Sequence, residues 1–330
     1  MGEAGAGAMS PLPPVAIDFV NFLIPAGIFA IIALGLNVQW GHTGLFNAGV
    51  AAFIGLGAYT AAILMTGPAP ATNQYPGHLG GFSWPFLAAV IVAMVVAGVA
   101  GLLIALPILR LRADYFAIAT LALAETVRLF FTNAEDITAG TIGIILIPRP
   151  IVIADPGLSD VVMAGLVITT LFLAYFVIQY LTKAPWGRVL RGIREDEEAT
   201  LALGKNTFRF RLSAFVVGCI VMGLAGAFLA AFLRFVTPTQ FDPLSTFTIY
   251  VMVILGGSGN NRGVIFGAFL FYAFDWVSVR VKDFLPASLQ GPIPYVRLMV
   301  IGALLVILVL YRPEGIFREK KRTYPPVVRE

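Results

Sequence analysis

Side chains that could do catalytic or metal chemistry are few in this 330-residue chain. It has two histidines, His42 and His78, far apart in the sequence, and one cysteine, Cys219, within an apolar run. A zinc site needs several Cys, His or carboxylate ligands, so we expect no metal. The sequence also lacks the pattern G-x-x-x-x-G-K-[ST] that cradles phosphates. We therefore expect no catalytic site and no cofactor bound by this chain.

Polar side chains gather instead around a glycine-rich interruption between two apolar runs. Asn37, His42, Thr43 and Asn47, with Gln39 between the first two, lie in or beside the sequence Gly41-His-Thr-Gly44. Neutral hydrogen-bonding groups of this kind suit a zwitterionic solute, whereas the capping of helix ends accounts for Thr43 and Asn47 equally well. The four residues are candidates for a translocation path, and the capping alternative stays open.

One apolar run also contains ionisable residues. Glu125 lies near the middle of residues 114–132, and Arg128 follows three positions later on the same helical face. Charged groups within a span are functional hypotheses by default, because hydrocarbon does not solvate them. Either the two side chains pair with each other, or Glu125 lines a polar cavity. Thr120 and Glu125 complete the candidate translocation path.

A charge-dense segment between Lys183 and Arg211 differs from the rest of the chain. It holds seven basic and four acidic residues, 11 of the 40 charged residues in the protein. Its pattern predicts one or two short helices that begin near Pro185 and end near Gly204. The expected apolar face consists of Val189, Leu190 and Ile193, followed by Leu201 and Leu203. The segment is either a solvated loop or a docking helix for a soluble partner.

The rest of the sequence predicts a membrane protein. Mean hydropathy is +0.88, hydrophobic side chains make up 58% of the chain, and no charged residue occurs between residues 19 and 109. A helix needs about 20 apolar residues to cross the hydrocarbon core. Suitable runs lie at 18–38, 45–66, 85–109, 114–132, 160–182, 210–235, 244–257, 262–280 and 295–311. We expect an all-α, polytopic transmembrane helical bundle of about nine spans, with eight to ten allowed.

Two of these runs are short and bordered by glycine-rich sequences. They are 45–66, which follows Gly41–Gly44, and 244–257, which ends at Gly256-Gly-Ser-Gly259. Short or glycine-interrupted spans point to broken helices around a transport site, although a tight turn between ordinary helices is the alternative. The bundle should therefore contain one or two broken or short helices.

Basic residues predict the orientation of the bundle. Those that share one side of a nine-span arrangement are Arg110, Arg112, the segment 183–211, Arg262, Arg312, Arg318, Lys320, Lys321 and Arg322. The positive-inside rule makes that side the cytoplasm and leaves the N-terminus outside. The loops 67–84 and 133–159 then face outward, and Arg280 and Lys282 are exceptions to the rule.

Three parts follow from this arrangement. Residues 1–14 form a flexible tail, residues 15–312 a transmembrane domain with its cytoplasmic loop at 183–211, and residues 313–330 a cytoplasmic tail. The net charge of +4 falls in short patches beside apolar spans, so we expect membrane lipid rather than nucleic acid as a partner.

Five blocks of the sequence carry a family resemblance. The first block is Gly35–Asn47 with Gly57–Tyr59. The second, Leu111–Glu125 with Arg128, is similar to the family pattern "RLRGDYLAIVTLGFGE..R", and the third, Ile137–Ile144, to "LTGG..GI". The fourth, Gly187–Gly204, is similar to "GRALRAIREDE.AA...G", and the fifth, Val253–Gly259 with Gly263, to "VVLGGMGS..G". In this order the five blocks resemble the LivM-type permease subunits of branched-chain amino-acid ABC importers. Ala113 and Ala139 stand where that pattern has glycine, and Asn260-Asn261 departs from the last block.

The charged segment contains a second resemblance. Glu198-Ala199-Thr200, followed by Gly204, resembles the E-A-A-x-x-x-G loop of ABC import permeases, although the distal I-x-L-P portion is missing. In that family the loop inserts into a cleft on the ATPase subunit. The resemblance therefore implies an ATPase-coupling loop that includes Arg188, Arg191, Arg194, Glu195, Glu198, Ala199 and Gly204.

The resemblance also implies the assembly. The partners would be a second, LivH-type permease subunit, two ABC ATPase subunits that bind ATP and Mg, and an extracytoplasmic solute-binding protein. The substrate would be leucine, isoleucine, valine or another neutral amino acid, and the location the cytoplasmic (inner) membrane of a bacterium or archaeon. This chain would be a transport subunit and not an enzyme. A urea or short-chain amide permease is the alternative, and a secondary solute carrier or a membrane scaffold belongs to other classes.

Overall fold

The computed structural model describes residues 13–68, 77–151, 156–283, 299–303, 306–307, 310–311 and 315–317. Within them the elements are α1 (Pro14–Leu36), a π-helical turn η1 (Asn37–Gly41), α2 (Val50–Met65), α3 (Phe86–Ile108), α4 (Ala113–Asn133), α5 (Glu135–Thr138), α6 (Pro156–Lys183), α7 (Pro185–Glu195), α8 (Glu197–Ala202), α9 (Thr207–Leu233), a 3-10 turn η2 (Pro238–Phe241), α10 (Pro243–Gly256) and α11 (Asn261–Asp283). A single antiparallel bridge joins Ile144 to Val236 in this part of the chain. The all-α prediction is confirmed.

Most of the predicted spans correspond to helices. Long apolar helices cover 17–41, 86–108, 114–133, 157–183, 207–233 and 261–280, and each is long enough to cross a membrane. The shorter apolar helices are α2 and α10, the two runs that the sequence marks as short. The expected ninth span, 295–311, and most of both predicted tails lie outside the described residues, although 299–303 are helical. The polytopic bundle is confirmed, and its span count stays approximate.

The centre of the bundle is α9, which packs against α1, α2 and α3. Glycines allow this close approach. A Cβ on Gly57 of α2 would collide with the backbone of Gly223 on α9, and one on Gly226 would collide with the carbonyl of Ile54. Lipid gives helices little hydrophobic reason to associate, so small residues that bring backbones together hold such a bundle.

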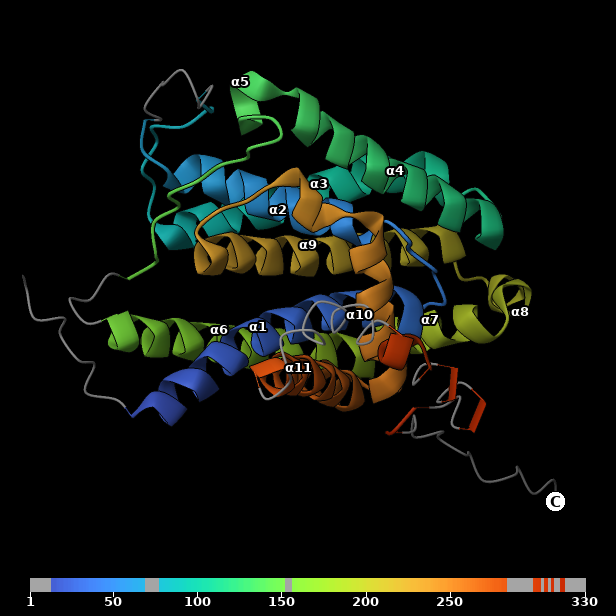
Figure 1. The fold of residues 1–330 in the computed structure, drawn as a ribbon. Coiled ribbons are helices and arrows are strands. Elements are labelled where there is room, and N and C mark those ends of the chain that lie inside the picture. Colours follow the sequence, from blue (N-terminus) through green and yellow to red (C-terminus); the bar gives the residue numbers. More distant parts are fainter. Residues whose placement is uncertain are drawn as a thin grey trace, which may run out of the picture.

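The charged helices α7 and α8 lie together at one end of the long helices (Figure 1). The loop that precedes α3 and the loop that precedes α6 lie at the opposite end. The connection that carries Arg110 and Arg112 follows α3 at the first end, and Arg262 lies in the first turn of α11 at the same end. Among the described residues, the basic residues that the sequence assigned to one side therefore lie at one end of the bundle.

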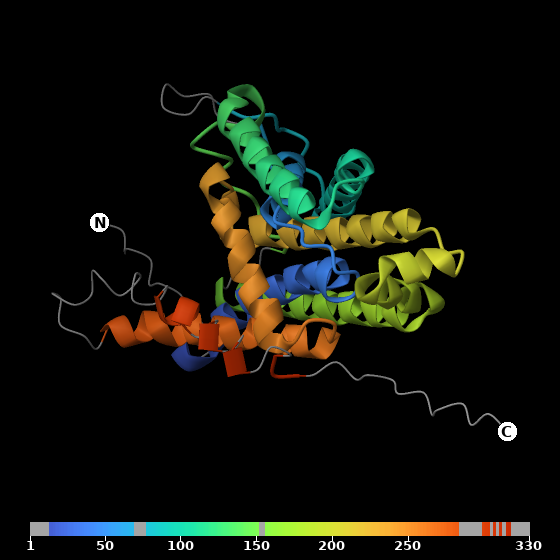
Figure 2. The same ribbon diagram turned by 90° about the vertical axis from the view of Figure 1, so that its right-hand side faces the viewer.

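The short helix α10 differs from its neighbours in direction. In both views it runs across α9 rather than alongside it, from the neighbourhood of α4 toward α11 (Figures 1 and 2). It contacts α11 most closely and also touches α1, α2 and α4. A helix of 14 residues placed crosswise does not form a full membrane crossing of its own.

Candidate functional site

The first helix of the bundle breaks at the glycine-rich sequence near its end. α1 passes into the π-helical turn η1, and residues 42–49 are not helical until α2 begins at Val50. The predicted run 45–66 therefore starts later than expected. π-helical turns inside helices are frequent at functional sites. The break is buried within the bundle, where each of its backbone groups needs a partner from the protein.

Three of the predicted path residues supply those partners. The hydroxyl of Thr43 donates to the carbonyl of Val38 at 2.9 Å, and the side-chain oxygen of Asn47 accepts from the Gly49 N–H at 2.9 Å. Thr120 reaches across from α4 and accepts from the Ala48 N–H at 3.0 Å. Thr43 and Asn47 thus satisfy backbone groups of the break, although the N-cap residue of α2 is Gly49. Thr120 does the same from a neighbouring helix. The role of the three residues in a translocation path stays a prediction.

Two more helices hold the break, through Gln39 and Tyr250. The amide nitrogen of Gln39 donates to the carbonyl of Phe215 on α9 at 2.8 Å, and its oxygen accepts from the amide of Asn47 at 2.8 Å. The hydroxyl of Tyr250 on α10 donates to the carbonyl of Asn47 at 3.1 Å. These side chains are all buried. The non-helical backbone is thus held from α4, α9 and α10 together.

The break meets the glycine-rich turn between α10 and α11 at Asn37. This turn, residues 257–260, corresponds to the tight-turn alternative for Gly256–Gly259, and we call it the second break. The side-chain oxygen of Asn37 accepts from the Gly259 N–H at 2.9 Å, and its amide nitrogen donates to the oxygen of Asn261 at 2.8 Å. His42 Nε2 lies 3.1 Å from the same Asn261 oxygen, which can only accept, so this contact requires a proton on Nε2. A Cβ on Gly41 would collide with Gly259. The backbones therefore approach more closely than side chains would allow.

Asn261 extends this cluster to α6. Its amide nitrogen donates to the side-chain oxygen of Gln179 at 2.9 Å and to the hydroxyl of Thr182 at 3.3 Å. In the sequence, Asn261 stands out only as a departure from a pattern, and nothing marks Gln179 or Thr182 as members of a site. A polar residue directly after a glycine-rich turn was the available signal. We call Asn37, His42, Gln179, Thr182 and Asn261 the break cluster.

The charged segment touches the break directly. Arg194 of α7 donates from Nη1 to the carbonyl of Gly41, the last residue of η1. The same side chain lies over Gly44, where an added Cβ would come within 3.2 Å of the Arg194 Cγ. Gly44 has a φ of +79°, a conformation that favours glycine. Arg191 also reaches the membrane helices, since it donates to the carbonyl of Thr182 at 3.3 Å.

Two short helices form the charged segment, as predicted. The extended residue Asp196 separates them and caps α8 by accepting from the Ala199 N–H at 2.9 Å. Because of this kink, Leu201 and Leu203 do not continue the apolar face. Leu190 and Ile193 are buried, whereas Leu201 is 51% exposed and Leu203 79% exposed. The expectation of one continuous apolar stripe was wrong.

Other contacts anchor the segment. Trp186 Nε1 donates to the Ser213 hydroxyl at 2.8 Å, and Arg211 pairs with Glu197 at 3.0 Å. Gly204 has a φ of +75°, and its N–H donates to the Leu201 carbonyl at 2.8 Å, which fits the predicted end of the helix. Most other members of the predicted coupling loop point outward, among them the exposed Arg188, Glu195, Glu198 and Ala199.

Glu125 does not join the break cluster. Its Oε2 accepts from Arg128 Nε at 2.9 Å, which confirms the pairing alternative. The side chains are 40% and 26% exposed and lie on an outward face of α4. The structure thus separates the predicted path residues into a buried group around the break and one ion pair at the surface of the chain. Among the described residues, no three His, Cys, Asp or Glu side chains gather as a metal site would require.

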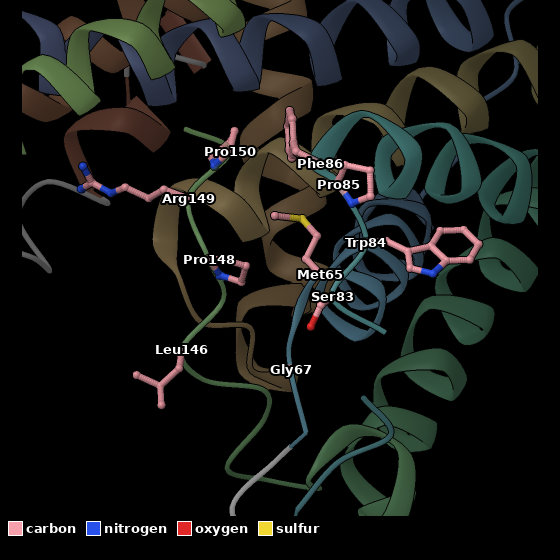
Figure 3. Close-up of a pocket in the computed structure, with 10 residues that line it drawn as sticks. All are labelled: Met65, Gly67, Ser83, Trp84, Pro85, Phe86, Leu146, Pro148, Arg149 and Pro150. Carbon is pink, nitrogen blue, oxygen red and sulfur yellow. The ribbon is translucent and has the colours of Figure 1, made fainter. Parts of the chain in front are cut away.

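A pocket of about 420 Å³ opens at the end of the bundle opposite α7. Figure 3 shows residues 146–150 on one side of it, and Met65 with residues 83–86 on the other. The Arg149 side chain points away from the pocket and pairs with Asp160 at 2.7 Å. α2 begins at the break and ends at this pocket, so the two sites are separated by roughly 22 Å along that helix.

The predicted outer loops come together around this pocket. The Leu79 N–H donates to the Ile137 carbonyl at 3.2 Å, which joins one loop to the other. Ser83 and Leu146, on opposite walls, both have positive φ values of 48° and 59°. Such strained backbone clusters at functional sites. His78 contacts the Thr66 hydroxyl at 2.9 Å, and burial lowers the pKa of its imidazole.

Comparison with known proteins agrees with this architecture. The family model described as "Branched-chain amino acid transport system / permease component" matches residues 19–309. The high-affinity branched-chain amino acid transport system permease protein LivM of Escherichia coli is 32% identical over 312 residues, which cover 88% of this chain and 67% of that protein. The probable LivM protein of Methanocaldococcus jannaschii is 28% identical over 336 residues, covering 95% and 97%.

Another relative is named for a different substrate. The fructose import permease protein FrcC of Rhizobium meliloti is 28% identical over 148 residues, which cover 43% of this chain and 39% of that protein. No solved structure matches the chain. The family match spans nearly all of the helical bundle, including both breaks and the charged segment. The chain therefore belongs to the branched-chain amino acid permease family of ABC importers.

Proposed function

We propose that this permease imports branched-chain or other neutral amino acids, and that separate subunits supply the energy by hydrolysing ATP with bound Mg. Residues 15–312 form the translocation domain, and the segment 183–211 couples it to the ATPase. The single observation that carries this proposal is the contact of Arg194 with Gly41, because it connects the charged segment to the break in the membrane helices.

Charge supports a cytoplasmic position for the coupling segment. The end of the bundle that carries it also carries the α3–α4 connection with Arg110 and Arg112 and the first turn of α11 with Arg262, as the positive-inside rule expects. The tail residues 315–317 lie there too, since the Ile316 N–H donates to the Leu255 carbonyl at 3.1 Å. The C-terminus and the coupling segment are then on the cytoplasmic side of the membrane, where ATPase subunits reside.

The exposed leucines at the end of the coupling segment support docking. Leu201 and Leu203 stand in a charged loop outside the membrane helices, where water rather than lipid would surround them. Fully burying a leucine side chain stabilises an interface by about 1.5–3 kcal/mol. The charged neighbours Glu198, Arg188 and Lys205 would form a polar rim around this apolar contact.

The contacts of the break supply a route from docking to transport. A displacement of α7 moves Arg194, and Arg194 holds the end of η1 at Gly41. From there Asn37 connects to Gly259 and Asn261, at the second break. In the present conformation the break cluster is closed on itself, because its hydrogen-bonding groups are directed at one another. ATP-driven rocking would separate these partners and expose them to the solute.

The chemistry of the break suits a neutral amino acid. Its side chains are amides, hydroxyls and one imidazole, and the described cluster contains no carboxylate that would repel the carboxyl group of a zwitterion. The LivM relatives of Escherichia coli and Methanocaldococcus jannaschii carry branched-chain amino acid transport in their names. At the opposite end, the loops around the 420 Å³ pocket provide the surface for an extracytoplasmic solute-binding protein.

Copurification tests the docking part of the proposal. The double variant Leu201→Ser with Leu203→Ser should insert into the membrane normally but retain much less ATPase subunit than the wild type. The matched control is Leu111→Ser, which changes another exposed leucine at the same end of the bundle, outside the coupling segment. Equal ATPase recovery with the double variant would contradict docking through these leucines, and the absence of any ATPase from the wild-type complex would contradict the proposed function.

A further inference from the structure

The ion pair on α4 has an unusual position for a membrane helix. Glu125 and Arg128 are partly exposed on the surface of the chain rather than directed into the bundle. α4 is apolar enough to span the membrane from residue 114 to residue 133. At 1.5 Å per residue, Glu125 lies roughly 16 Å from the start of this span, near the middle of the hydrocarbon core.

A third charged residue comes from another element. Asp242 lies between η2 and α10, is exposed, and interacts electrostatically with Arg128. The three residues form one patch with two carboxylates and a single guanidinium. Beside them on α4, Ala122 and Thr126 are also exposed. We call Ala122, Glu125, Thr126, Arg128 and Asp242 the α4 patch.

Other outward faces of the bundle have a different character. The mid-parts of α3 and α6 expose large apolar side chains, among them Leu103 of α3 and Phe172 and Leu173 of α6. α3 has no charged residue, and those of α6, Asp160 and Lys183, lie near its ends. These faces fit lipid chains. The α4 patch does not, because hydrocarbon offers no hydrogen-bonding partner to three charged groups.

We propose that the α4 patch is the surface against which a second, non-identical permease subunit packs. This inference rests on the proposed function, together with the second permease subunit that the family resemblance implies. The depth of the α4 patch in the membrane excludes soluble subunits as its partner, because they reach only the ends of the helices. Ala122 and Thr126 are four residues apart, and small side chains at this spacing allow another helix to approach closely.

The charge of the α4 patch favours a distinct partner over a second copy of this chain. A twofold interface places the same patch of both copies face to face. Two copies would then bring an excess of carboxylates together in a region of low dielectric constant, where like charges repel strongly. A distinct subunit that presents a basic or hydrogen-bond-donating side chain at this depth complements the patch.

Photo-crosslinking in the intact transporter tests the assignment. In a Cys219→Ala background, Thr126→Cys is labelled with a maleimide–benzophenone probe in membranes that contain the complete complex. Leu173→Cys on α6, another exposed residue within a span, is the matched control. After illumination, mass spectrometry identifies the crosslinked molecule. We expect an adduct between Thr126→Cys and the second permease, and lipid adducts at Leu173→Cys.

Any other product at Thr126→Cys overturns the inference, whether lipid alone, an ATPase subunit, the solute-binding protein or a second copy of this chain. A second variant gives an independent readout. Ala122→Trp should reduce recovery of the second permease in a pull-down, whereas Leu173→Trp should leave it unchanged, and equal recovery would contradict the interface. ATP-driven uptake by the same preparation distinguishes a failure of the proposed interface from a failure of the proposed function. Uptake without the expected adduct refutes the interface alone, whereas loss of ATPase association in the wild type refutes the proposed function.

Discussion

At the scale of single residues, Asn37 determines how the two breaks meet. It is fully buried, and its amide uses a donor and an acceptor at once, toward Asn261 and Gly259. No other residue type of similar size offers both in a fixed fork. Because the groups it satisfies belong to different helices, Asn37 stabilises the closed arrangement of the break as well as the fold.

Replacement of Asn37 by alanine should therefore destabilise the protein. The Gly259 N–H and the Asn261 oxygen would each lose a partner in a buried position, which costs about 1–3 kcal/mol. The thermal unfolding midpoint of the purified permease in detergent measures the effect. Asn133→Ala is the control, since Asn133 makes a single side-chain bond at an exposed position, to the Leu129 carbonyl at 2.7 Å. Equal shifts for the two variants would contradict a special role for Asn37.

At the scale of elements, α7 connects two parts of the molecule with different tasks. Its buried face, with Leu190 and Ile193, packs on the bundle, and Arg194 continues that face to the end of η1. Its exposed face leads to α8 and the outward leucines. Under the proposed function, a helix held at both points would transmit a push from a docked subunit to the break, since packed helices move as rigid bodies.

The variant Arg194→Gln should separate ATP hydrolysis from uptake. A hydrogen bond to a charged group contributes about 1.5–3 kcal/mol, so solute transported per ATP hydrolysed should fall about ten-fold or more. ATPase subunits should still copurify, because the outward face of the segment is unchanged. Arg188→Gln on the exposed side of α7 is the control. If Arg194→Gln keeps the wild-type ratio of uptake to hydrolysis, the contact with Gly41 does not couple the two.

Local sequence patterns predicted the helices and their breaks better than they predicted the contacts between helices. Glycines at Gly41–Gly44 and Gly256–Gly259 revealed both breaks, because glycine disfavours a continuous helix wherever it occurs. The hydrogen bond between Asn37 and Gly259 joins residues 222 positions apart, and no local period encodes such a contact. Leu201 and Leu203 were misplaced for a related reason, since one extended residue, Asp196, changes the direction of every side chain that follows.

At the scale of the whole molecule, the two ends of the bundle differ in kind. One end carries the charged segment and the break cluster, and the other carries the pocket between Trp84 and Pro148. Such a polarity suits a permease that receives a solute on one side and energy on the other. The chain contains no phosphate-binding loop, so the energy must come from a partner if transport depends on ATP.

Uptake by proteoliposomes tests this account most directly. The permease is reconstituted with the second permease and the ATPase subunits, the solute-binding protein is added outside, and ATP is enclosed inside. We expect accumulation of radiolabelled leucine that requires enclosed ATP and stops when the ATPase subunits are left out. Accumulation by this chain alone, driven by a proton or sodium gradient and unaffected by ATP, would contradict the account.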